Sequence, residues 1–229
     1  TDKPFNFTIF KEVPRLAVIK PKEVTKGHAI FGFEGNADDL IIELLTKTPE
    51  NFKSEIIYEK NKDTINYWYT PFETDSLNFK VTKGDYSKEF TLNLRSTKID
   101  SLKLTPNSIG TLHLKDTFNI STNSPIINFD TSLIKITKKD STEVSFKPFL
   151  SKSKTNLYLN FDKEYNTDYS IQLLPKTITD IYEISNDSLT YKLKTKSPEA
   201  IFAVNELFAV TAIKVATRLG IKIPEELSI

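Results

Sequence analysis

The residues with the clearest potential for ligand chemistry are three consecutive aromatic residues, Tyr67, Trp68 and Tyr69. An exposed cluster of this kind can stack against sugar rings, so the three residues are candidates for glycan binding. Because side chains alternate between the two faces of a strand, the three rings cannot all point the same way. Core packing on at least one face is therefore the competing interpretation.

The two histidines and one acidic loop offer little for metal or cofactor binding. His28 and His113 are far apart, and without cysteine the common zinc ligand sets cannot be assembled. We expect both to be surface or edge residues. Asn36, Asp38 and Asp39 carry oxygen atoms that Ca²⁺ could use, but a solvated turn with local side-chain hydrogen bonds is the simpler interpretation. We expect no metal and no cofactor.

No catalytic constellation is visible, and the chain is predicted not to be an enzyme. The segment 32–35 (GFEG) is too short for a phosphate-binding or dinucleotide-binding loop, and the absence of cysteine excludes thiol chemistry. The 31 basic and 30 acidic residues nearly balance, and the basic ones are almost all lysine, so no nucleic-acid partner is expected. No run of about 18 apolar residues predicts a transmembrane segment.

The first two hundred residues have the period-two alternation of β-strands, with turn residues between the runs. Leu77, Phe79 and Val81 alternate with polar residues, and similar runs occur from 5–9 to 189–193. The segment 41–45 is predicted to be a strand rather than a short helix. A strand and turn every eight to twelve residues is typical of β-sandwiches. We therefore predict a mainly β chain with tandem sandwiches at 1–99 and 100–197. The sequence leaves open whether 1–99 is one complete sandwich or the end of one followed by a second.

The segment 198–229 differs from the rest in composition. Five alanines fall within 200–216, whereas only three occur before it. The apolar run 200–204 is predicted to be a buried strand, and Asn205 is a favourable N-cap for the helix that follows. Gly220 is well placed to end that helix in a left-handed conformation. These features predict a short strand–helix (α/β) segment.

Residues 100–197 resemble the bacterial Ig-like modules of surface and S-layer proteins. The similarity lies in 124–134 (SPIINFDTSLI), 140–144 (DSTEV), 169–173 (YSIQL) and 178–180 (ITD). The whole of 1–197 is similar to the middle of a cell-envelope lipoprotein built from such modules. The resemblance implies an extracytoplasmic, non-enzymatic scaffold whose partner is a protein or a cell-surface glycan. Since the chain contains no Met, we expect a processed form or a fragment.

The tail resembles a different family, the C-terminal lobe of lac-repressor-type transcription regulators, which share the fold of periplasmic sugar-binding proteins. The similarity lies in 198–206 (PEAIFAVNE), 212–214 (AIK) and 219–229 (LGIKIPEELSI). It implies that Asn205 and Glu206 contact an effector sugar, with Glu206 at a position where the family has Asp. The match lacks a DNA-reading element, and we expect a foreign segment joined to the sandwiches.

Three functional hypotheses follow. The leading one is a structural or interaction module of the cell envelope. The alternatives are a fragment of a sugar-responsive transcription regulator, which would be cytoplasmic, and a carbohydrate-binding module that uses Tyr67, Trp68 and Tyr69. The sequence does not define an oligomeric state.

Overall fold

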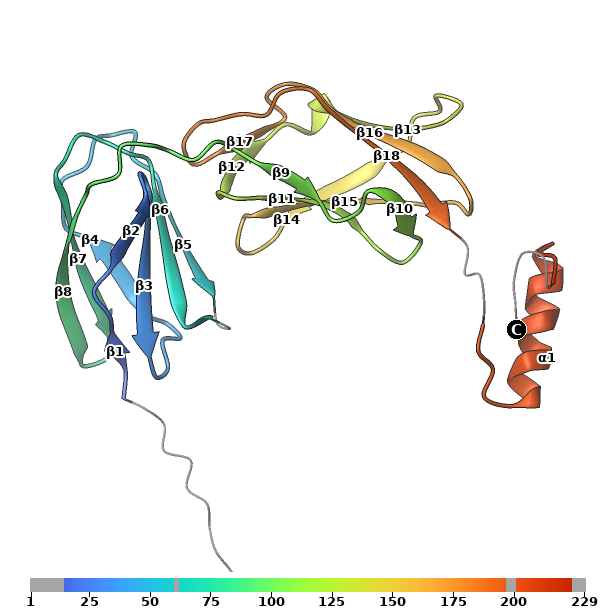
Figure 1. Ribbon diagram of the computed structural model, residues 1–229, viewed down its shortest axis with the longest axis horizontal. Coiled ribbons are helices and arrows are strands. Elements are labelled where there is room, and N and C mark those ends of the chain that lie inside the picture. Colours follow the sequence, from blue (N-terminus) through green and yellow to red (C-terminus); the bar gives the residue numbers. More distant parts are fainter. Residues whose placement is uncertain (1–14, 60–61, 197–200, 224–229) are drawn as a thin grey trace, which may run out of the picture.

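The computed structural model describes residues 15–59, 62–196 and 201–223, and these form two β-sandwiches followed by one helix (Figure 1). The chain is therefore mainly β, as predicted. The alternation expected at 5–9 lies outside the described residues, as do residues 224–229 of the tail.

The first sandwich comprises β1 to β8 and has the strand order of an immunoglobulin-type domain. One sheet has the order β1–β3–β6–β5, with β2 also paired to β3, and the other has the order β4–β7–β8. These correspond to the A-B-E-D and C-F-G sheets of the constant-type fold. The strands are β1 (Ala17–Val18), β2 (Lys22–Thr25), β3 (His28–Glu34), β4 (Ile41–Leu44), β5 (Ser54–Glu59), β6 (Thr64–Tyr69), β7 (Ser76–Lys83) and β8 (Tyr86–Asn93). The predicted strand at 41–45 is confirmed by β4.

The second sandwich comprises β9 to β18 and repeats this plan with two additional features, a separate two-stranded ribbon and a parallel strand. One sheet has the order β9–β11–β15–β14 and the other β10–β18–β16–β13, while β12 and β17 form a separate ribbon. Strand β10 is parallel to β18, as the A′ strand is to G in Ig-type domains, and the other pairings are antiparallel. The strands are β9 (Leu104–Pro106), β10 (Gly110–His113), β11 (Phe118–Thr122), β12 (Ile126–Phe129), β13 (Ile134–Lys138), β14 (Phe146–Leu150), β15 (Asn156–Phe161), β16 (Asp168–Leu173), β17 (Ile178–Asp180) and β18 (Leu189–Lys196), with a 3-10 turn at Thr131–Leu133.

Each sandwich has its own core, built from every second residue along its strands, the ones that point inward. In β7, Leu77, Phe79 and Val81 are all fully buried, and in β16 the inward residues Tyr169, Ile171 and Leu173 are buried. The buried residues form two separate hydrophobic clusters, one for each sandwich. Because each sandwich buries its apolar faces internally, their mutual orientation depends on the residues where they meet.

The tail contains a helix but no strand within the described residues. Helix α1 (Glu206–Arg218) begins after Asn205, whose side chain accepts a hydrogen bond from the Phe208 N–H at 3.0 Å, so the predicted N-cap is confirmed. Gly220 has φ +71°, as expected for the residue that ends the helix. The strand predicted at 200–204 is wrong for 201–204, and Ala200 lies outside the described residues.

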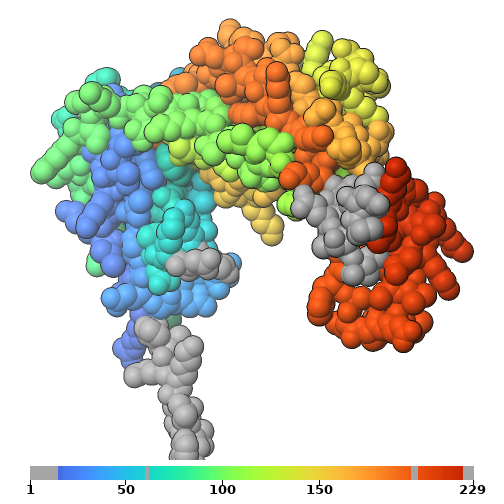
Figure 2. All heavy atoms as spheres, turned by 45° about the vertical axis from the view of Figure 1, so that its right-hand side comes forward, coloured from blue at the N-terminus to red at the C-terminus, as the bar shows by residue number. Residues whose placement is uncertain are grey.

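The absence of a strand at 201–204 has a physical cause. A strand needs a neighbour for its backbone hydrogen bonds, and the structure pairs none with this segment. Phe202 and Val204 are 92% and 73% exposed. Figure 2 shows the atoms of the tail as a lobe beyond the second sandwich. No helix in the described parts of the chain has the length and apolarity needed to cross a membrane.

Candidate functional site

The first candidate site is the junction of the two sandwiches, where a turn of the second packs against the start of β3. Gly27 has φ +89°, and a Cβ there would lie 2.4 Å from Tyr182 Cε1 and 2.8 Å from the Tyr69 carbonyl oxygen. A Cβ at this position would overlap both atoms, and the left-handed φ also favours glycine. Gly27 therefore lets the Tyr182 ring approach the backbone of the first sandwich.

Aromatic rings continue this contact into the first sandwich. Tyr182 lies 6.2 Å from Trp68 between ring centroids, and Trp68 stacks on His28 at 3.6 Å with the planes 4° apart. His28 also shares a 2.8 Å hydrogen bond between its Nε2 and Asn66 Oδ1. Burial lowers the pKa of His28, while Asn66 and the charges of Asp100 and Glu59 oppose that shift. His28 is only 7% exposed, so the prediction of a surface histidine is wrong.

The turn that presents Tyr182 is organised by a buried carboxylate. Asp180 is fully buried, and its Oδ1 accepts hydrogen bonds from the Tyr182 and Ile184 N–H groups, both at 2.9 Å. Its Oδ2 accepts one from the Ser124 hydroxyl at 2.7 Å. Burial raises the pKa of Asp180, and these three hydrogen bonds oppose the rise. Glu183 takes a positive φ of 65° in the same turn, a position that glycine commonly fills.

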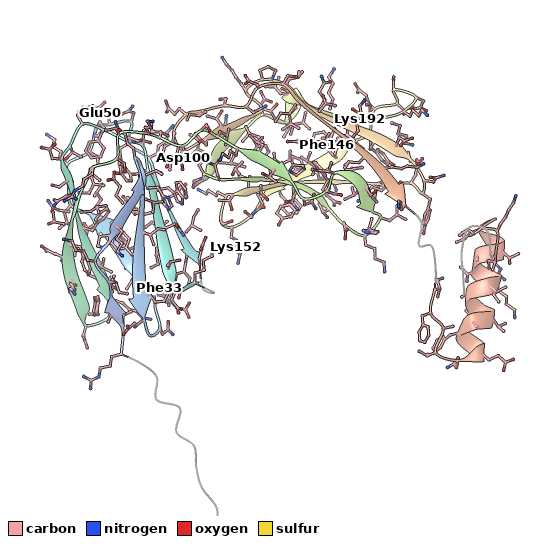
Figure 3. The ribbon with its side chains drawn as sticks, viewed as in Figure 1. Phe33, Glu50, Asp100, Phe146, Lys152 and Lys192 are labelled. Carbon is pink, nitrogen blue, oxygen red and sulfur yellow. The ribbon has the colours of Figure 1, made fainter. Side chains whose placement is uncertain are left out.

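Polar contacts on both sides of Tyr182 join the sandwiches. The Thr70 hydroxyl donates to the Ile181 carbonyl at 3.4 Å. Lys53 pairs with Glu183 at 3.2 Å, and Lys154 pairs with Glu55. Exposed ion pairs of this kind contribute little energy individually. Figure 3 places Asp100, in the connecting segment, beside this junction.

The buried hydroxyl of Tyr182 is a second distinctive feature of the junction. Neither it nor the nearby Thr25 hydroxyl has a partner at hydrogen-bond geometry within the described residues. Burial raises the pKa of Tyr182 well above its ordinary value. The tyrosine is therefore neutral at physiological pH and acts as an apolar contact.

The predicted glycan-binding residues divide between the core and the junction. Tyr67 and Tyr69 are buried in the first sandwich, and burial raises the pKa of Tyr69 to about 12. These two rings are therefore not available as stacking platforms, because strand alternation turns them inward. Trp68 points outward, but His28 covers one of its faces. Of the three residues, Trp68 is the one for which glycan stacking remains a prediction.

The predicted effector residues lie at the start of α1. The Asn205 side chain caps the helix, so its Oδ1 is engaged with the Phe208 N–H. Glu206 is exposed in the first turn. No pocket of a sensor domain surrounds the pair among the residues described, and effector binding stays a prediction.

The remaining residues considered for metal binding lie in separate places. His113 is exposed on β10. In the acidic loop, Asn36 Oδ1 accepts a hydrogen bond from the Asp38 N–H at 2.7 Å, and the Lys83 ammonium donates to Asn36 O and Oδ1 at 2.9 and 3.2 Å. Within the described residues, no group of three or more potential metal-ligating side chains is present.

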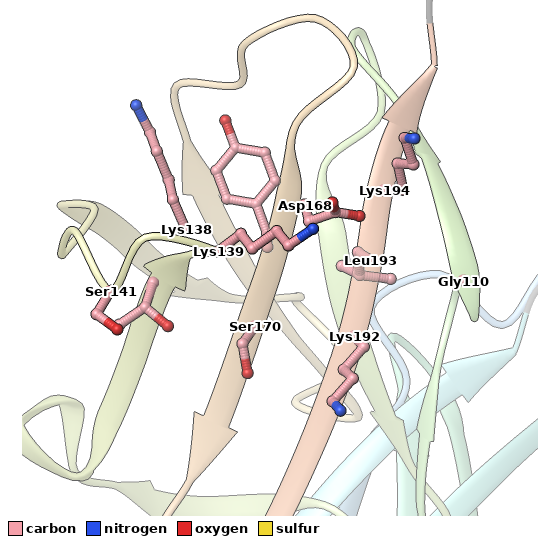
Figure 4. Close-up of a pocket in the computed structure, with 11 residues that line it drawn as sticks. Gly110, Lys138, Lys139, Ser141, Asp168, Ser170, Lys192, Leu193 and Lys194 are labelled. Atoms are coloured by element: carbon pink, nitrogen blue, oxygen red, sulfur yellow. The ribbon is translucent and has the colours of Figure 1, made fainter.

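A second candidate site is a hollow on the outer face of the sheet β10–β18–β16–β13, shown in Figure 4. Its volume is about 660 Å³. Lysine side chains form much of its rim, and Asp168 and Ser170 lie between them (Figure 4).

Sequence reasoning did not identify the most connected residues of either site. Gly27 and Asp180 were visible only as turn residues, and Tyr182 as part of a loop. The lysines of β18 alternate at Lys192, Lys194 and Lys196, a signal that could have indicated one charged strand face.

Comparisons with known proteins give no family and only distant similarities among solved structures. No protein-family model matches the chain, and no curated protein matches it. The resemblance of 199–229 to lac-repressor-type regulators therefore has no support from these searches. Among solved structures, the chain is similar to tandem Ig-like domains of titin and of a surface-layer protein.

The surface-layer protein SbsC, domains 4–9, is 9% identical with a TM-score of 0.30, over 83% of this chain and 34% of that one. The titin I9–I11 tandem is 12% identical with a TM-score of 0.25, over 80% of this chain and 66% of that one. SbsC domains 4 and 5 are 17% identical with a TM-score of 0.24, over 82% of this chain and all of that one. The chain thus spans about a third of the longer SbsC fragment. Its class, a tandem Ig-like β-sandwich protein, rests on its own strand order.

Proposed function

We propose that the chain is a non-enzymatic structural module of the cell envelope, in which two Ig-like domains at 1–99 and 100–197 act as a spacer of defined shape. The observation that carries this proposal is the insertion of Tyr182 against Gly27, since it fixes one domain relative to the other. A spacer or scaffold needs a defined distance between its ends, and a packed junction provides one. The extracytoplasmic location and a surface partner belong to the same proposal.

Both sandwiches contribute residues to the junction. Tyr182 comes from the turn after β17, whereas Gly27, Trp68 and Thr70 come from the start of β3 and the end of β6. A loosely linked pair of domains would have no buried contact of this kind, because interdomain motion is the default where the interface is small.

The contact depends on hydrogen bonds inside the second sandwich. Asp180 uses both carboxylate oxygens to hold the turn, so Tyr182 reaches the junction already positioned. A side chain that is held before contact loses little conformational entropy on packing. The orientation of the domains is therefore a property of the folded chain and does not require a partner.

The proposal is tested by measuring the distance between spin labels placed on the two sandwiches of the full chain. Because the chain has no cysteine, Glu89→Cys on β8 and Lys147→Cys on β14 give two specific labelling sites. We expect one narrow distance distribution, and we expect Tyr182→Ala to broaden it. The matched control is Tyr165→Ala, which removes an exposed tyrosine of the second sandwich away from the junction.

A narrow distribution that Tyr182→Ala leaves unchanged would show that another contact sets the orientation. A distribution that is already broad in the unmodified chain would refute the spacer proposal. Far-UV circular dichroism of each variant establishes that both sandwiches remain folded.

A further inference from the structure

The lysine-rimmed hollow on the second sandwich has the features of a binding surface. It lies on the outer face of the sheet β10–β18–β16–β13, opposite the face that packs into the core. Its floor is formed where Thr137 of β13 pairs with Ser170 of β16. Both small side chains line the hollow together with longer lysine side chains, and Figure 4 shows Ser170 with Lys139 to one side and Lys192 to the other.

The rim is cationic because of the register between β16 and β18. Lys192 lies opposite Ser170 and Lys194 opposite Asp168. Residues two apart on a strand point to the same face and lie about 6.5–7 Å apart, so these lysines form a row. Lys139, on the other side of β16, extends toward Asp168 (Figure 4). The hollow is thus flanked by ammonium groups on two sides.

These charges are available to a ligand. Lys138 is held by Glu164 in an ion pair of 2.5 Å. By contrast, Lys139, Lys192 and Lys194 form no ion pair with a carboxylate in the described part of the chain. Lys192 and Lys194 are exposed. An anionic ligand would therefore gain several charge contacts without displacing a protein carboxylate.

The groups between the lysines favour a sugar polymer over a nucleic acid. Ser141, Ser170 and Thr137 offer hydroxyl groups, and Asp168 offers a carboxylate that can accept hydrogen bonds from sugar hydroxyls. Residues 100–197 contain no arginine. The aromatic ring that lines the hollow, Tyr169, is buried, so no base could stack on it.

We propose that this hollow binds an acidic polysaccharide, with Lys139, Lys192 and Lys194 contacting its carboxylate or sulfate groups and Asp168 accepting a sugar hydroxyl. This inference is independent of the spacer role, because no residue of the hollow contributes to the contacts described at the junction. It is also distinct from stacking on Trp68, which lies in the first sandwich.

The experiment measures binding of the full chain to immobilised polygalacturonate and heparin, at low ionic strength and at about 0.15 M salt. Neutral dextran and single-stranded DNA serve as comparison ligands. We expect saturable binding to an acidic polysaccharide that weakens with salt. The double variant Lys192→Gln/Lys194→Gln should weaken it by about five- to thirtyfold, from two exposed charge contacts.

The matched control is Lys103→Gln/Lys147→Gln, which removes the same charge from exposed positions of the same sandwich. It should change the affinity less than twofold. Equal losses in the two double variants would show a response to overall charge and would overturn the proposal. Since all four side chains are exposed, folding should persist, and thermal unfolding checks this. If the rim double variant does not fold, Lys139→Gln serves as the rim variant.

Asp168→Ala separates sugar recognition from simple ion exchange by the sign of its effect. The variant makes the hollow more positive, so a non-specific anion site would bind more tightly. A site that uses Asp168 as a hydrogen-bond acceptor should bind about three- to tenfold more weakly. Tighter binding by Asp168→Ala, stronger binding of DNA than of either polysaccharide, or no saturable binding at low salt would each refute the proposal.

Discussion

Substituting Gly27 by alanine should disturb the fold of the first sandwich and its junction together. Its φ of +89° lies in a region that L residues rarely adopt, which costs about 1–3 kcal/mol for a non-glycine residue. The new Cβ would lie 2.8 Å from the Tyr69 carbonyl oxygen and 2.4 Å from Tyr182 Cε1. Steric overlap of this kind adds about 1–3 kcal/mol. We therefore expect Gly27→Ala to lower the free energy of unfolding by about 2–6 kcal/mol.

The Tyr69 carbonyl cannot move away easily, because the N–H group of the same residue is held by a backbone hydrogen bond. The Tyr69 N–H donates to the Gly27 carbonyl at 2.9 Å, so the two residues are tied at the end of the β3–β6 pairing. The Tyr182 ring, by contrast, belongs to the other sandwich and can be pushed out. Gly27→Ala should therefore also separate the domains and broaden the distance distribution between them.

Gly84→Ala is the matched control for the backbone conformation. Gly84 has φ +53°, but a Cβ there would meet no atom within 4 Å. Gly84→Ala should therefore lower the free energy of unfolding only through its left-handed conformation, by about 1–2 kcal/mol. The difference between the two variants isolates the steric effect at the junction.

The assay is urea unfolding followed by the fluorescence of Trp68, the only tryptophan, which lies beside the junction. Circular dichroism follows both sandwiches in parallel. In the double variant Gly27→Ala/Tyr182→Ala, part of the overlap is removed, so the two effects should be less than additive. Equal losses of stability in Gly27→Ala and Gly84→Ala would refute the steric argument.

Four further predictions concern the buried polar groups and the tail. Because burial lowers the pKa of His28, the folded chain binds fewer protons than the unfolded chain, and stability should fall as the pH drops below about 6.5. The urea midpoint should therefore be lower at pH 5.5 than at pH 7.5 in the native chain and in His113→Gln, and this difference should be smaller in His28→Gln. Tyr182→Phe should leave the free energy of unfolding unchanged or raise it slightly, because it removes a buried hydroxyl without a hydrogen-bond partner. Asp180→Ala should lower the free energy of unfolding by about 2–4 kcal/mol in the same urea experiment, because it leaves several hydrogen-bond donors unpaired. Limited proteolysis with mass detection should cleave 201–223 before either sandwich, since most of its apolar side chains are exposed; a tail that resists the protease would show that it packs against another surface.

Local sequence patterns were sufficient for the strands of the two sandwiches and for helix α1, but not for the segment 201–204. Alternation in segments such as 77–81 predicted strands because one face of each strand must be apolar to enter a core. Asn205 and Gly220 marked the ends of α1 because capping depends on a side chain and a backbone conformation within one turn. The two-sandwich organisation followed from the spacing of strands and turns.

Patterns in neighbouring residues could not locate the sites. His28 belongs to the outer face of its sheet, and only the approach of Trp68 and the second sandwich makes it buried. The run at 201–204 has the apolar character of a buried strand, but no other strand pairs with it in the described residues.

The amino-acid sequence alone determined the class of this protein, because strand alternation, turn spacing and helix capping are local properties. The tertiary structure decided where its surfaces act. It brought Gly27 against Tyr182 across 155 positions of the chain, and it placed Lys139 and Lys194 on opposite sides of Asp168. Those contacts depend on strand order and register, which join residues that are distant in sequence and which no local pattern specifies.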